Sequence, residues 1–173
     1  MGFGTVVATG ISIILLLLTA YVLLVGFSGA IDAMTYSIKE VQNMKNDQLK
    51  TEVELTNIVT SGHNITFELK NSGNIRITNF TMMDMILTFN RTLEDDTKTT
   101  YWLPYRSVPA VEENAWTETS IYPDMINPGM LDPGETLYGR AYINDELWPG
   151  SLGWMSITTQ NGVSGSSYFN VTM

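Results

Sequence analysis

The first 31 residues of the chain carry no charged side chain, and the first charge is Asp32. As a helix, residues 6–27 would be about 33 Å long at about 1.5 Å per residue, which exceeds the roughly 30 Å of a membrane's hydrocarbon core. No polar stripe interrupts this stretch, and residues 15–18 are four consecutive leucines. A helix satisfies its own backbone hydrogen bonds, so lipid can surround it on all sides. The pattern predicts a transmembrane or filament-core helix.

A cleaved signal peptide is the main alternative for this segment. Ser28 and Ala30 have the small-residue spacing of a cleavage site. The apolar run is longer than the core of a usual signal peptide, however, and no Lys or Arg precedes it. We therefore interpret the helix as a retained anchor.

The charges near the helix give an ambiguous orientation. Lys39, Lys45 and Lys50 all follow the apolar run, and the positive-inside rule applied to them places the following domain in the cytoplasm. The domain itself has features of an extracellular protein, described below. We therefore expect it outside the cell membrane, with an extracellular filament as the alternative.

Length and charge limit what the rest of the chain can be. The 173 residues leave room for one anchor and one domain of roughly 120 residues, which is large enough to bury its own core. The chain has no cysteine, so disulfides and thiolate metal sites are excluded. A formal charge of −9 argues against nucleic-acid binding, which needs clustered Lys and Arg. An acidic, self-sufficient domain is predicted.

The helix is expected to continue past the apolar run, to about Lys45. Two stripes with helical spacing extend into the charged sequence. The small-residue stripe consists of Gly26, Ala30, Ala33 and Ser37, and the apolar stripe consists of Ile31, Met34, Ile38 and Val41. Small residues let helix backbones approach closely, so these stripes are candidate packing faces for copies of the chain or for sister subunits. A helix that leans on its own domain would show the same pattern. We place the domain boundary between residues 1–48 and 49–173.

From Thr51 onward the hydrophobic period changes from that of a helix to two, the period of a β-strand. Residues 65–69 alternate apolar and polar after a turn at 61–64, and Met83, Met85, Leu87 and Phe89 share one face. Further strands are expected at 99–103, 116–122, 136–143, 154–159 and 166–172, with a turn at 94–96. Seven to nine short strands without a later helix predict an antiparallel, immunoglobulin-like β-sandwich.

The second half of the chain is rich in aromatic residues around its prolines. These residues could fill the sandwich core, or they could be anchors for a partner protein, as aromatic residues often are at interfaces. The candidate partner contacts are Trp102, Tyr105, Trp116 and Trp148.

No residue pattern indicates catalysis. His63 is the only histidine and lies in a predicted turn, and the acidic clusters lack the spacing of a calcium loop. We therefore expect no enzyme activity, no metal site and no cofactor. A tethered hydrolase or a calcium- or sugar-binding module is the remaining alternative of this kind.

Four positions match the acceptor pattern for N-glycosylation. They are Asn64, Asn79, Asn90 and Asn170. Glycosylation requires an outward-facing domain, so these sequons favour an extracellular location.

Together these features resemble archaeal type IV pilin-like proteins, and in particular the archaellum stator proteins FlaF and FlaG, which are related to archaellins. The resemblance rests on the MGFG start before the apolar helix, on ITFELKNSGN at 65–74, and on Asn79-Phe80-Thr81 and Pro133-Gly134-Glu135. No basic residue precedes the apolar run, unlike in a usual prepilin, and this departure favours an unprocessed anchor.

The resemblance implies a structural component of the archaeal motility apparatus, a membrane-anchored stator protein with its sandwich outside the cytoplasm. It also implies contacts with sister stator subunits or copies of the chain, and with surface-layer protein. A filament subunit, either archaellin or adhesive pilin, is the alternative within the same superfamily.

Overall fold

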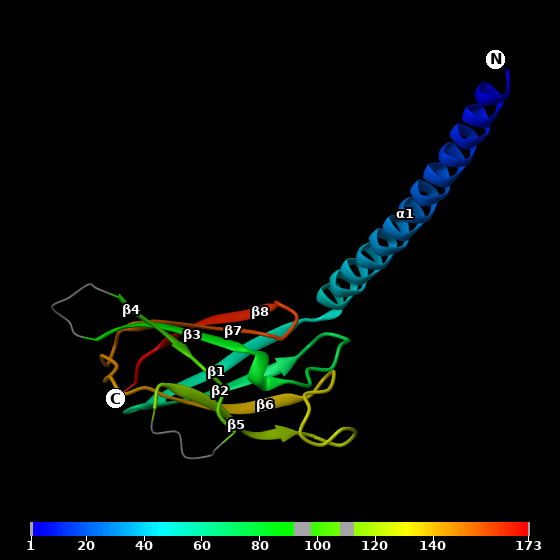
Figure 1. Cartoon of the computed structure of the whole chain (residues 1–173). Helices are drawn as coiled ribbons and strands as arrows, with labels where there is room; N and C mark the ends of the chain where they lie inside the picture. The colour runs from blue at the N-terminus through cyan, green and yellow to red at the C-terminus, as the bar shows by residue number, and fades with distance from the viewer. Residues whose placement is uncertain (1, 92–97, 108–112, 173) are drawn as a thin grey trace. The chain divides into compact units, whose positions relative to one another are not determined.

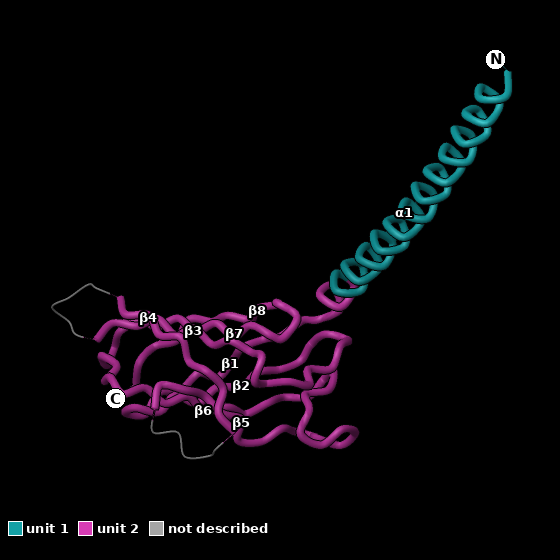
Figure 2. The backbone as a smooth tube through the Cα atoms, viewed as in Figure 1, with its two compact units in different colours: residues 1–45 teal, residues 46–173 magenta. Residues whose placement is uncertain are grey.

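The computed structural model describes residues 2–91, 98–107 and 113–172. It consists of one long helix, α1 (Phe3–Lys50), followed by two four-stranded antiparallel sheets (Figure 1). Two compact units are present, residues 1–45 and residues 46–173 (Figure 2). The predicted combination of an N-terminal helix and a β-sandwich is confirmed.

Helix α1 extends five residues beyond the expected end at Lys45. Its last turn belongs to the second compact unit and is fixed by side-chain hydrogen bonds. The Gln48 side chain donates to the carbonyl of Asn161 at 2.8 Å, and the Thr51 hydroxyl caps the helix by donating to the carbonyl of Asp47 at 2.8 Å. The sequence period alone did not reveal these contacts.

The sandwich has the strand order of an immunoglobulin-like domain. One sheet has the order β1-β2-β6-β5 and the other β4-β3-β7-β8. This is the ABED and C′CFG arrangement of immunoglobulin folds, so the predicted fold class is confirmed. The strands are β1 (Val53–Ser61), β2 (Asn64–Asn71), β3 (Asp84–Asn90), β4 (Lys98–Leu103), β5 (Ala115–Tyr122), β6 (Thr136–Tyr142), β7 (Leu152–Thr158) and β8 (Ser164–Asn170).

The inward residues of the strands form a single core between the sheets. On β3, Met85, Leu87 and Phe89 are buried, as their alternation predicts. Two phenylalanines each fill the space over a glycine of the neighbouring strand. Phe67 lies opposite Gly139 and Phe169 lies opposite Gly153, and a Cβ at either glycine would come within 2.2 Å of the ring. These glycines are therefore required for aromatic packing.

The predicted turn at 94–96 lies outside the described residues. The strands on either side of it, β3 and β4, do pair antiparallel, from Met85 with Leu103 to Asn90 with Lys98. The hairpin of β1 and β2 is also present, with Ser61 paired to Asn64 around Gly62. Gly62 has a φ of 57°, a left-handed conformation that suits glycine.

Candidate functional site

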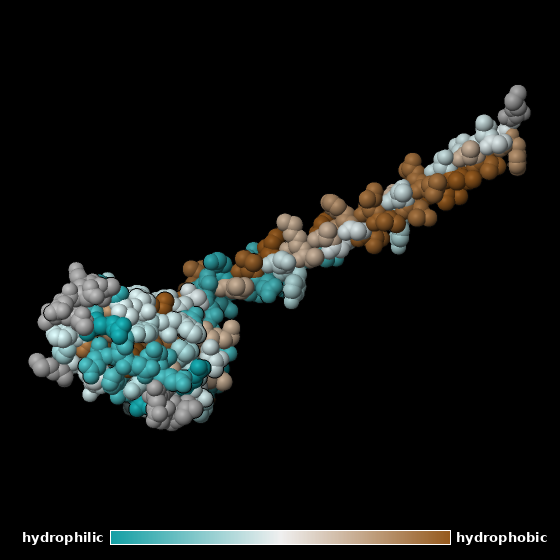
Figure 3. All heavy atoms as spheres, turned by 60° about the vertical axis from the view of Figure 1, so that its left-hand side comes forward, coloured by the Kyte–Doolittle hydropathy of each residue, from teal (hydrophilic) through white to brown (hydrophobic). Residues whose placement is uncertain are grey.

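The apolar part of α1 is long and hydrophobic enough to span a membrane by length and composition, and Figure 3 shows its apolar side chains in brown. None of its side chains is buried in the structure. The hydroxyls of Thr9, Ser12 and Thr19 each donate to a carbonyl of the preceding turn, at 2.8 to 3.0 Å. A hydroxyl whose hydrogen bond is made within its own helix can enter a lipid environment at low cost. This helix is the candidate membrane contact.

Both predicted stripes lie on the continuous helix α1. At 100° per residue, the small-residue stripe falls on one face and the apolar stripe on the adjacent face. The Ser37 hydroxyl donates to the carbonyl of Ala33 at 3.0 Å, so the polar member of the stripe has an internal partner. The packing role of these eight residues remains a prediction.

One of the four aromatic candidates for partner contact is buried in the sandwich core. Trp116 is 0% exposed, and its ring contacts Phe67 and Tyr105 at centroid distances of 6.0 and 5.1 Å. It is a core residue, and the prediction of a partner contact at Trp116 is wrong. The reason is local: Ala115, Trp116 and Thr117 are all buried, so the start of β5 has no inward–outward alternation.

The other three aromatic candidates differ in exposure. Trp102 is 61% exposed on β4, and its indole nitrogen donates to Asp84 at 2.9 Å. Tyr105 is half-buried against Trp116, and burial raises the pKa of its hydroxyl well above the usual range, with a further contribution from its hydrogen bond to Glu118. Trp148 is partly buried. Trp102 is the candidate that offers most surface to a partner.

A network of buried acids organises the loop between β5 and β6. The Asp132 carboxylate pairs with Arg76 at 2.5 Å and accepts a hydrogen bond from the Asn127 side chain at 2.9 Å. These two contacts, Asn127 first, lower the pKa of Asp132. Glu135 accepts hydrogen bonds from the backbone nitrogens of Asp132 and Met125, at 2.9 and 3.3 Å. Its carboxylate therefore ties the loop to the turn before β6.

This loop presents apolar side chains at the surface. Met125 and Ile126 are 79% and 77% exposed, although the network holds the backbone next to them. The sequence analysis did not identify this network. The Asp132-Pro133-Gly134-Glu135 turn, which has an acid at each end, was the sequence signal for it.

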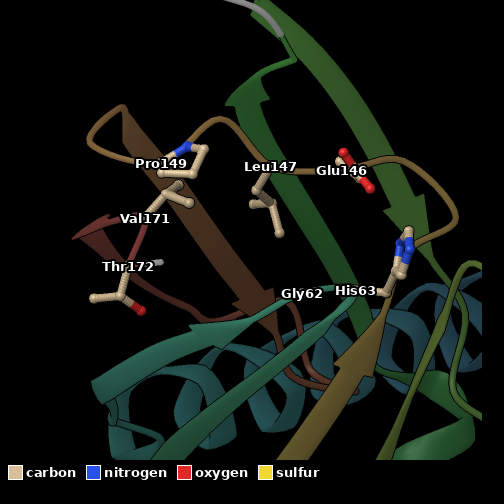
Figure 4. A pocket seen from close by; sticks show the side chains of 7 residues that line it. All are labelled: Gly62, His63, Glu146, Leu147, Pro149, Val171 and Thr172. Carbon is tan, nitrogen blue, oxygen red and sulfur yellow. The ribbon is translucent and has the colours of Figure 1, made fainter.

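A hollow of about 300 Å³ lies at one end of the sandwich (Figure 4). His63 and Glu146 line it together with Leu147, Pro149 and Val171. The Nδ1 atom of His63 is hydrogen-bonded to the carbonyl of Ile143 at 3.0 Å. Across the described ranges, no cluster of three or more metal-ligating side chains is present. This hollow has one histidine and one acid, which do not define a recognised catalytic arrangement.

The four sequons have different surroundings. Asn79 and Asn170 are exposed, whereas Asn64 and Asn90 are partly buried. Asn79 caps a short 3-10 helix, and its Oδ1 accepts hydrogen bonds from the Thr81 nitrogen and hydroxyl, at 3.1 and 2.6 Å. Asn79 and Asn170 therefore remain the more accessible candidates for glycosylation.

The chain resembles known proteins at the level of whole-chain architecture. A relative from Archaeoglobus fulgidus, itself described as an uncharacterized protein, is 28% identical over 99% of this chain and 98% of its own length. No family model matches the chain.

Solved structures share its fold. The archaellum periplasmic stator protein FlaG from Sulfolobus acidocaldarius is 19% identical, with a TM-score of 0.52, over 69% of this chain and 99% of that one. The complex of FlaF and FlaG from the same organism gives 18% identity and the same TM-score, over 69% of this chain and 89% of that one. The archaeal flagellum of Methanospirillum hungatei strain JF1 is 16% identical, with a TM-score of 0.57, over 99% of this chain and 94% of that one. The chain therefore has an archaellin-related, FlaF/FlaG-like fold.

Proposed function

We propose that this chain is a membrane-anchored structural component of the archaellum, a stator protein of the FlaF and FlaG type that performs no catalysis. The observation that supports this best is one continuous chain in which an apolar helix precedes an immunoglobulin-like sandwich of the archaellin-related fold. A stator must hold static contacts outside the membrane while a filament turns. An anchor joined directly to a rigid sandwich suits that task.

The proposed partners are sister subunits or copies of the chain, and surface-layer protein. A solved FlaF–FlaG complex has a similar fold, which supports sister contacts for this chain. Surface-layer contact rests on the family resemblance alone. The sandwich would then lie between the cell membrane and the surface layer.

A filament subunit is the second candidate function. The match to the Methanospirillum hungatei flagellum covers 99% of the chain, and so includes the helix, whereas the FlaG match covers 69%. In this alternative, α1 would leave the membrane and pack in the core of a filament.

Deleting the gene in the native host separates the two candidates. A stator protein predicts filaments that still assemble but do not drive swimming, and purified filaments that lack this chain. A dominant band of this chain in purified filaments would instead establish the filament subunit. Swimming at the normal rate after deletion would contradict both.

The mass of the intact native protein tests the anchor itself. The stator proposal expects a mature chain that retains residues 3–50. Removal of a short leader that leaves this helix intact would favour the filament subunit. A mature chain that lacks the helix would overturn the anchor.

A further inference from the structure

The outer face of the β4-β3-β7-β8 sheet is almost uncharged, although the chain as a whole carries a formal charge of −9. Its outward positions are the even-numbered residues of the four strands, and among these only Asp84 and Lys98 are charged. Trp102, Tyr168 and Leu152 on this face are 61%, 68% and 53% exposed.

The outer face of the other sheet is different. Its outward residues include the charged side chains Glu54, Glu68, Lys70 and Arg140. An exposed apolar face with few charged residues marks an interaction surface. The β4-β3-β7-β8 face is therefore the better candidate for protein contact.

Four of the seven hydroxyl groups at the outward positions of this face are paired with one another. The Thr88 and Thr100 hydroxyls lie 3.0 Å apart, and those of Thr158 and Ser164 lie 2.7 Å apart. A polar group that already has a hydrogen-bond partner costs much less to bury than an unpaired one. The face can therefore be covered by a partner that supplies few hydrogen bonds.

Each of the four strands has one large residue and one small hydroxyl residue at its two central outward positions. The strand register arranges them in two adjacent rows across β4, β3, β7 and β8. The first row consists of Trp102, Ile86, Ser156 and Ser166. The second row consists of Thr100, Thr88, Trp154 and Tyr168. On every strand, one row holds the large residue and the other row holds the small hydroxyl residue.

We propose that this face binds the same face of a second copy of the chain. The two copies are related by a two-fold axis that lies in the plane of the interface, parallel to the two rows and midway between them. This rotation places the first row of one copy over the second row of the other. Each large side chain then meets a small one, as close packing between sheets requires. A two-fold interface must be self-complementary, and these rows meet that condition.

The two charges of the face are also self-complementary under this rotation. Asp84 begins β3 at one end of the face, and Lys98 is paired with Asn90 at the other end. The axis brings Asp84 of one copy over the end that carries Lys98 of the other, and it does so twice. Asp84 of one copy then lies over Asn90 of the other, one strand spacing of about 4.8 Å from the strand that carries Lys98, so the two opposite charges of the face approach each other across the interface.

The size of the face predicts a weak dimer. Four strands about 4.8 Å apart, each about seven residues long at about 3.3 Å per residue, cover roughly 440 Å². A stable interface buries about 800 Å² per partner, so the contact belongs to the weak class. Anchoring both copies in one membrane raises their effective concentration, which compensates for low affinity. The dimer is thus expected in the full-length, anchored protein. The inference rests on the membrane anchor of the proposed function, but not on the assignment to the archaellum.

Charge reversal in the full-length protein, in detergent micelles, tests the geometry by sedimentation equilibrium. Lys98→Glu would place an acid one strand away from Asp84 of the other copy and should weaken self-association roughly tenfold, because two attractive charge pairs become repulsive. Adding Asp84→Lys to the same chain should restore the association. Lys70→Glu, the same change on the opposite sheet, is the control and should leave association unchanged.

A second pair of variants tests the centre of the face. Ser166→Arg places a charge against Tyr168 of the other copy and should weaken association at least tenfold, whereas Thr66→Arg on the opposite sheet should not. The proposal is overturned if the full-length protein is monomeric at all concentrations. It is also overturned if Lys98→Glu and Lys70→Glu behave alike, if the double reversal stays as weak as the single one, or if both arginine variants associate like the unmodified chain.

Discussion

Asp132 is a carboxylate that the sandwich buries and pairs, and its ionisation contributes to stability in acid. Its folded-state pKa is lowered, so its contribution is fully present above the unfolded pKa, near 3.9, and is lost as the pH falls through the folded value. We expect the free energy of unfolding attributable to Asp132 to be constant from pH 7 to about pH 5 and to fall below about pH 4.

Denaturant unfolding at a series of pH values measures this contribution. Asp132→Asn should reduce stability at pH 7 and flatten the decline between about pH 4 and pH 2, because the variant has no carboxylate to protonate there. Glu146→Gln, at an exposed position, is the control and should retain the original pH dependence. Parallel curves for Asp132→Asn and the unmodified protein would contradict the assignment.

The two tryptophans Trp116 and Trp102 make a matched test of burial. Trp116→Ala should destabilise the sandwich by about 3–5 kcal/mol, because it leaves a cavity against Phe67 and Tyr105. Trp102→Ala should cost less than about 1 kcal/mol, because its ring is mostly exposed. Urea unfolding monitored by circular dichroism measures both, and equal losses would argue against Trp116 as a core residue.

The strands show which elements a sequence can predict. Strands with regular alternation, such as β2 and β3, were assigned with the correct inward faces, because one buried face imposes a period of two. The start of β5 has three consecutive buried residues, so its period gave no information about Trp116. The two rows of outward residues on the β4-β3-β7-β8 sheet depend on the pairing of β3 with β7, strands that are distant in the chain. No local pattern encodes that pairing.

The small-residue stripe of helix α1 can be tested by substitution. If the small-residue stripe packs against another helix, Ala30→Leu or Ala33→Leu should lower the self-association of the full-length protein in detergent, because a larger side chain prevents close backbone approach. Sedimentation equilibrium measures the change. Ala8→Leu, which lies about 33 Å before Ala30 along the helix, is the control. Equal association in all three variants would leave the stripe facing lipid, and association would then come from the sandwich.

At the scale of the whole chain, the sandwich has its own core, independent of residues 1–45. The inward residues of both sheets form one cluster that contains no residue of α1. A domain of this size can bury enough apolar surface to fold without a disulfide or a metal. The anchor and the sandwich can therefore be separated experimentally.

A fragment of residues 46–173 should fold alone and give a mainly β circular-dichroism spectrum. The last turn of α1 belongs in this fragment, because Gln48 donates to the Asn161 carbonyl and the Asn161 side chain donates to the Thr51 hydroxyl at 2.5 Å. A fragment of residues 52–173 lacks these bonds and should be less stable by about 1–3 kcal/mol in urea unfolding. Gln48→Ala in the longer fragment should account for part of that difference. A mainly helical spectrum, or equal stability of the two fragments, would show that the sandwich does not depend on the end of the helix in this way.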